Sequence, residues 1–146
     1  MRQTLTERAT TWLLRLIGGT ICLAFVPVFF PLSWMQAVHV WLGLGDMPQS
    51  TIVEYLARSL SAMYFAHGVV VLAISTDVRR YCPLVSMLGY LNMVLGAIFL
   101  GVDLVAQMPW FWTISEGPPI ALMGLVLLLI SRAIASSDQS MRKASN

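Results

Sequence analysis

Arg58 is the residue whose position most needs a chemical explanation, because it lies about one turn inside the outer end of the second predicted membrane-spanning helix. A charge inside such a segment is expensive, so it is generally paired or functional. The carboxylates that could neutralise it are those of Glu54, Asp103 and Glu116. An arginine among three carboxylates could tie helices together, or it could form the floor of a polar pocket for a head group or a small ion. Both interpretations remain open at this point.

Three further polar side chains fall within apolar segments: Tyr64, His67 and Asn92. A histidine in this setting can relay protons or bind a metal. However, His39 is the only other histidine, and neither His-Glu-x-x-His nor Cys-x-x-Cys spacing occurs. We therefore expect no metal site, and we expect Asn92 to bond with Tyr64 or His67 inside a helix bundle.

The sequence contains no familiar catalytic signature. It has no Gly-x-Ser-x-Gly elbow, no phosphate-binding glycine loop and no dinucleotide fingerprint. Asp103 and Glu116 could serve as an acid/base pair, but nothing in the sequence sets their separation. We therefore expect no catalytic residues and no cofactor, and we favour a protein that is not an enzyme.

Four long uncharged segments must position these residues. The chain has 146 residues, 58% of them hydrophobic and 11% charged, with a mean hydropathy of +0.75; soluble proteins contain about a quarter charged residues. Asp, Glu, Lys and Arg are absent from residues 16–32, 59–76, 81–102 and 117–131. A spanning helix needs roughly 20 mostly apolar residues. The sequence therefore predicts an all-α integral membrane four-helix bundle.

Prolines and capping residues suggest where the helices begin and end. Pro27 and Pro31 should kink or end the first helix, and Thr51 with Glu54 resembles a capping box for the second. We expect one four-span domain over residues 1–135 and a polar cytoplasmic tail over 136–146. Its helices are predicted at about residues 11–32, 52–75, 83–106 and 118–135.

The first connection is the longest and is rich in apolar residues. Trp34, Val38 and Trp41 recur at helical spacing before Gly43 and Gly45. This spacing favours a short helix that lies in the membrane interface and ends at the glycines. A flexible apolar loop is the alternative.

Basic residues indicate which side each connection faces. Eight of the nine Lys and Arg residues flank the apolar segments on alternate sides, whereas the two remaining connections carry none. The positive-inside rule then places both termini in the cytoplasm, and we expect a bacterial inner-membrane location. The net charge of +2 follows from this bias and does not indicate nucleic-acid binding. The eight residues are Arg2, Arg8, Arg15, Arg79, Arg80, Arg132, Arg142 and Lys143.

Small residues predict how the third and fourth helices pack. Water does not drive helices together inside a bilayer, so close backbone contact and buried polar groups must do so. Each helix carries one face at spacings of three, four and seven residues that we expect in the bundle interior. These faces are Gly89, Asn92, Gly96 and Asp103 on the third helix and Gly117, Ala121, Gly124 and Ser131 on the fourth.

The stretch from Asp103 to Glu116, DLVAQMPWFWTISE, followed by Gly117 and Pro118, looks like a family signature. In length and layout the chain resembles small uncharacterised four-span bacterial membrane proteins, broadly similar to the DoxX group. The resemblance implies a fold and no site. A four-helix fold also serves sterol isomerases and lipid-binding receptors of the emopamil-binding type, whose intramembrane acid pattern is not evident here.

Three functions therefore remain in view. The first is a non-enzymatic accessory subunit or small binding protein, with the lipid bilayer and a homo-oligomer or membrane protein as partners. The second is a lipid-binding or lipid-modifying protein with an outward-facing polar pocket at Arg58, Asp103 and Glu116. The third is a small oligomeric transporter, since four spans without a repeat are few for a monomeric carrier.

Overall fold

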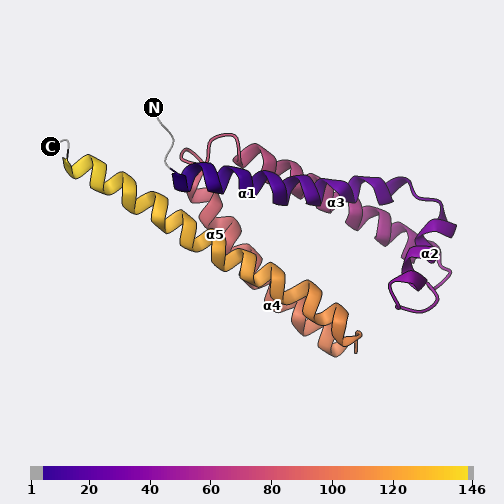
Figure 1. The fold of residues 1–146 in the computed structure, drawn as a ribbon. Helices are drawn as coiled ribbons and strands as arrows, with labels where there is room; N and C mark the ends of the chain where they lie inside the picture. The colour runs from indigo at the N-terminus through magenta and orange to yellow at the C-terminus, as the bar shows by residue number, and fades with distance from the viewer. Residues whose placement is uncertain (1–4, 145–146) are drawn as a thin grey trace. The chain divides into compact units, whose positions relative to one another are not determined.

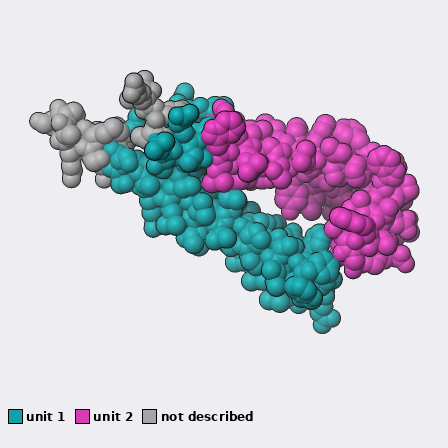
Figure 2. Space-filling view, viewed as in Figure 1, with its two compact units in different colours: residues 1–11, 76–146 teal, residues 12–75 magenta. Residues whose placement is uncertain are grey.

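The computed structural model describes residues 5–144, which are helical apart from short connections and include no strand. The chain divides into two compact units (Figure 2): unit 2 comprises residues 12–75, and unit 1 comprises residues 1–11 and 76–146. The elements are α1 (Leu5–Cys22), the 3-10 helix η1 (Leu23–Phe29), α2 (Leu32–Trp41), α3 (Thr51–Ile74), α4 (Cys82–Val105) and α5 (Trp110–Ala144). Figure 1 labels the five α-helices.

Four helical stretches within the described residues are long and apolar enough to cross a membrane. They are Leu5–Phe29, Thr51–Ile74, Cys82–Val105 and Trp110–Ser137. The predicted all-α class and the predicted number of potential spans are therefore confirmed. The sidedness of the termini stays a prediction.

The first span begins earlier than expected, and its α-helix ends in the region where Pro27 and Pro31 predicted a kink or an end. α1 starts at Leu5, whereas the prediction placed its start near residue 11. The charges of Glu7 and Arg8 shorten the apolar segment, but they do not prevent the backbone hydrogen bonds of a helix. Beyond Cys22 the chain tightens into η1, which contains Pro27. Phe30 is then extended (φ −63°, ψ 136°), as expected for a residue that precedes a proline.

The predicted capping box on the second span is wrong. Ser50, not Thr51, is the N-cap of α3, and its hydroxyl accepts a bond from the Val53 amide at 3.3 Å. Glu54 therefore lies one position beyond the site from which a capping carboxylate reaches back. Its carboxylate binds the side chain of Arg58 instead.

The fourth helix is longer than predicted at both ends, since the prediction placed it at about residues 118–135; the polar cytoplasmic tail over residues 136–146 stays a prediction. α5 begins at Trp110, continues through Pro118 and Pro119, and remains helical to Ala144. Gly117 explains this continuity in part, because a residue without a Cβ avoids the clash that a proline imposes on its predecessor. The polar segment after residue 135 includes good helix formers, so the loss of apolar character does not end the helix.

Close backbone packing joins α4 and α5 in unit 1 through glycines of the two predicted small faces, while their place in the interior of a bundle stays a prediction. A Cβ atom added at Gly96 would lie 2.6 Å from both the Ala121 nitrogen and the Gly117 oxygen. One added at Gly124 would lie 2.6 Å from the Gly89 oxygen. Only glycine allows this approach, which substitutes packing for the hydrophobic effect that is missing in lipid.

Unit 2 contains a glycine contact that the sequence analysis did not single out. A Cβ atom at Gly68 of α3 would lie 2.9 Å from the Gly18 oxygen of α1 and 2.8 Å from the Cys22 sulfur. The thiol of Cys22 also lies 3.9 Å from the Phe65 oxygen, as a weak donor. The contact anchors the middle of α3 against α1.

α2 occupies the segment in which a short helix was predicted. Gly43 (φ +74°) and Gly45 (φ +81°) follow it in the left-handed region that favours glycine. The Leu44 amide donates to the His39 oxygen at 3.2 Å, and the His39 ring nitrogen Nδ1 lies 2.9 Å from the Gly45 oxygen. These bonds form a compact end to the helix.

Candidate functional site

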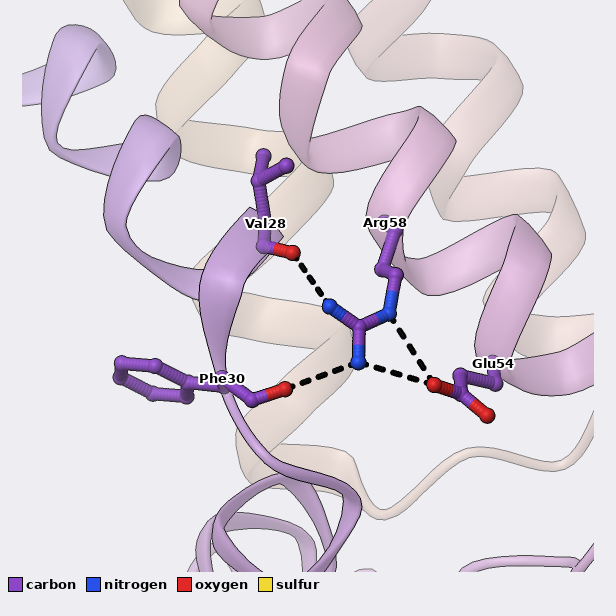
Figure 3. A network of polar contacts seen from close by, with 4 residues as sticks. All are labelled: Val28, Phe30, Glu54 and Arg58. Atoms are coloured by element: carbon purple, nitrogen blue, oxygen red, sulfur yellow. Dashed lines mark hydrogen bonds and ion pairs between the residues drawn. The ribbon is translucent and has the colours of Figure 1, made fainter.

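Arg58 is the centre of the polar network in unit 2 (Figure 3). It projects from α3, and its Nη1 donates to the Val28 oxygen at 2.5 Å while its Nη2 donates to the Phe30 oxygen at 2.9 Å. Glu54, one turn earlier on α3, accepts through Oε1 from Nη2 at 2.8 Å and from Nε at 3.2 Å. The guanidinium thus joins α3 to the end of η1.

Proline explains why this end of η1 needs a donor from elsewhere. In a 3-10 helix the oxygen of residue i accepts from the amide of residue i+3. For Val28 that residue is Pro31, which has no N–H. The guanidinium of Arg58 takes the place of the missing donor, and its positive charge suits the negative end of a helix.

Most of the hydrogen-bonding capacity of Arg58 is used within the chain. A guanidinium has five N–H groups. The four hydrogen bonds of Arg58 use the N–H on Nε, one N–H on Nη1 and both N–H groups on Nη2. The Arg58 and Glu54 side chains nevertheless remain 33% and 36% exposed. A second ligand could reach this pair, but the geometry is primarily that of a helix cap.

Asp103 and Glu116 belong to unit 1, where each has surroundings of its own. Glu116 accepts through Oε2 from the Trp112 indole nitrogen of the same helix at 2.6 Å. Asp103 is 5% exposed, and its Oδ2 has no hydrogen-bond partner among the residues that the structure describes. The structure therefore brings Arg58 and Glu54 together, whereas the participation of Asp103 and Glu116 in one cluster stays a prediction.

The interior polar residues also divide between the units. Tyr64 and His67 lie on α3, where Tyr64 is 37% exposed and His67 is half-buried. Asn92 is half-buried on α4. A hydrogen bond from Asn92 to either residue therefore stays a prediction.

Two polar contacts of basic residues were not predicted from the sequence. The first is the use of main-chain oxygens by Arg58, which the missing N–H of Pro31 could have indicated. The second is an ion pair within unit 1, in which Arg79 Nε lies 3.4 Å from Glu7 Oε1. The Glu7 side chain is only 9% exposed. The feature of the sequence that could have indicated this ion pair is the position of an acidic residue in a basic N-terminal segment.

Among the side chains that the structure describes, those of residues 5–137, no group of three or more His, Cys, Asp or Glu could hold a metal ion. Comparisons of the chain with protein-family models, with curated proteins and with solved structures gave no match. The likeness in layout to DoxX-type proteins therefore stays a prediction, and the function must be inferred from the chain itself.

Proposed function

We propose that this chain is a four-span protein of the bacterial inner membrane, with both termini in the cytoplasm, that acts as a non-enzymatic accessory subunit or binding protein. Four apolar helices support the membrane location. The alternation of basic residues along the sequence supports the orientation. In this orientation α2 lies in the outer interface, where Trp34 and Trp41, which are 59% and 82% exposed, suit the head-group region.

The observation that carries the non-enzymatic role is the use of Arg58 as a helix cap. A charged residue inside a span is a candidate for function by default. Here the guanidinium bonds to two main-chain oxygens and to Glu54. Glu116 likewise bonds to a tryptophan on its own helix. These contacts favour a structural use of groups that an enzyme would direct toward a substrate.

The exposed part of the Arg58–Glu54 pair supports a second candidate, a lipid-binding protein. Both side chains are about one-third exposed, so a phosphate head group could approach the guanidinium. Native mass spectrometry from mild detergent distinguishes the two candidates. A second protein at fixed stoichiometry supports the accessory role, whereas a retained phospholipid that is lost in Arg58→Met supports lipid binding. A protein that emerges alone contradicts both.

Cysteine labelling tests the orientation separately. Single cysteines are placed in a background with Cys22→Ala and Cys82→Ala, and intact cells are treated with a membrane-impermeant maleimide. We expect labelling at Asp46→Cys and Gln107→Cys, and labelling of Asp77→Cys only after the cells are opened. The reverse pattern would overturn the orientation without affecting the membrane class.

A further inference from the structure

One carboxylate oxygen of Asp103 is buried without a donor. The residue is 5% exposed, and Oδ2 makes no hydrogen bond within the described part of the chain. A polar oxygen removed from water is destabilising unless a hydrogen bond or a cation compensates it. A bound cation would supply a partner that the described residues do not give to this oxygen.

The helix that carries Asp103 increases this requirement. Asp103 lies in the last turn of α4, which ends at Val105. The carbonyl groups at the end of a helix give it a partial negative charge. A carboxylate placed there adds a like charge, so a bound cation would relieve both effects.

The packing of α4 against α5 places a second oxygen ligand at the same level. A Cβ at Gly117 would lie 2.7 Å from the Gly96 oxygen and 2.9 Å from the Leu100 nitrogen, which sets the antiparallel register. One turn further along this register, Asp103 on α4 lies opposite the first turn of α5. Thr113 is the buried residue of that turn, at 9% exposure.

Thr113 has capacity to bind an ion. Its hydroxyl donates to the Pro109 oxygen at 3.4 Å, a long bond that leaves the lone pairs of the hydroxyl available. The connection between the helices is held by the Met108 amide, which donates to the Asp103 main-chain oxygen at 2.9 Å. This main-chain bond holds the connection that joins the end of α4 to the first turn of α5.

We propose that Asp103 and Thr113 form a binding site for one alkali metal ion, sodium or potassium. Carboxylate, hydroxyl and carbonyl oxygens are hard ligands, which suit a hard cation. A single carboxylate balances a single positive charge, so a monovalent ion leaves the buried site neutral. The site goes beyond the accessory role proposed above and does not depend on it.

The test is thermal unfolding of the full-length protein in detergent at constant ionic strength. N-methyl-D-glucamine chloride is replaced stepwise by sodium or potassium chloride, and binding of radioactive sodium is measured in parallel. We expect one saturable site per chain and a rise in melting temperature of about 2–4 °C. Asp103→Asn should abolish both effects, and Thr113→Val should weaken ion binding by about tenfold.

Two variants serve as controls. Asp46→Asn removes an exposed acid from unit 2 and should leave the ion dependence unchanged. Thr113→Ser keeps the hydroxyl and should retain the site. If Asp103→Asn does not fold, the comparison of Thr113→Val with Thr113→Ser carries the test.

Three results would overturn the proposal. The first is identical unfolding in all salts without sodium binding. The second is an ion dependence that survives in Asp103→Asn. The third is an Asp103→Asn protein destabilised equally in every salt, since Asp103 would then pair with a cationic group of the protein or of a lipid.

Discussion

The two units contain two helix pairs that solve the same packing problem differently. In unit 2, α3 meets α1 at one glycine contact, between Gly68 and Gly18. In unit 1, α4 and α5 meet through four glycines over several turns, from Gly89 and Gly124 to Gly96 and Gly117. In unit 2, α3 is also joined to the end of η1 by the hydrogen bonds of Arg58, whereas in unit 1 close backbone packing joins α4 to α5.

Proline has opposite effects in the two pairs. Pro31 ends a helix after the bulky Phe30, and the Val28 oxygen that loses its donor is bonded by Arg58. Pro118 and Pro119 follow Gly117 and lie inside α5, which continues without a break. The comparison indicates that the preceding residue and the available donors decide whether a proline ends a helix in these spans.

The largest expected effect comes from blocking the close packing of unit 1. Gly96→Leu would place side-chain atoms on the backbone of α5, 2.6 Å from the Gly117 oxygen at the Cβ alone. We expect a loss of more than about 3 kcal/mol in stability, measured by unfolding in mixed detergent micelles. Gly101→Leu is the matched control, because a Cβ there meets nothing within 4 Å. Equal effects of the two variants would contradict the packing described for α4 and α5.

Removing the cap of η1 should have the next largest effect. Arg58→Met leaves the Val28 and Phe30 oxygens without their donor, so we expect a loss of about 2 kcal/mol. Amide hydrogen exchange should accelerate over residues 23–30 and remain unchanged over residues 89–104. Arg58→Lys keeps the positive charge but not the planar guanidinium with its several donors, so we expect about half of this loss in stability. Uniform acceleration across both units would argue against a local cap.

The single glycine contact of unit 2 should be more tolerant than the contacts of unit 1. Gly68→Ala brings a methyl group within 2.8 Å of the Cys22 sulfur, which can rotate, and 2.9 Å of the Gly18 oxygen, which cannot. We expect a loss of about 1–2 kcal/mol, measured by the same unfolding assay. Gly19→Ala is the control, since it meets nothing within 4 Å and should be neutral or slightly stabilising. If Gly68→Ala lowered the stability more than Gly96→Ala does, the glycine contact of unit 2 would be less tolerant than those of unit 1, contrary to this prediction.

The smallest effect should come from the charge of Glu54. Its pairing with Arg58 is about one-third exposed on both sides, so Glu54→Gln should cost less than about 1 kcal/mol. The amide oxygen of glutamine can still accept a bond, and only the ionic part is lost. The difference between variant and original protein should shrink as salt is added. A large, salt-independent loss would mean that Glu54 holds Arg58 by geometry rather than by charge.

Part of the site was predictable from local chemistry. The pairing of Arg58 with Glu54 follows from their four-residue separation on a helix, and the broken first span follows from Pro27 and Pro31. The start of α5 was predicted incorrectly because two prolines were taken as a helix start. The capping box failed because a shift of one residue in the start of α3 removes its geometry.

The sequence by itself determined the four apolar segments and the small faces of α4 and α5, because transfer from water to lipid and side-chain size are properties of the residues themselves. Tertiary structure alone decided that Arg58 bonds to carbonyls 28 and 30 residues away. It also decided that Glu7 pairs with Arg79 and that one oxygen of Asp103 is buried without a hydrogen-bond partner in the described part of the chain. Such contacts depend on the distances between helices, which composition and periodicity do not encode.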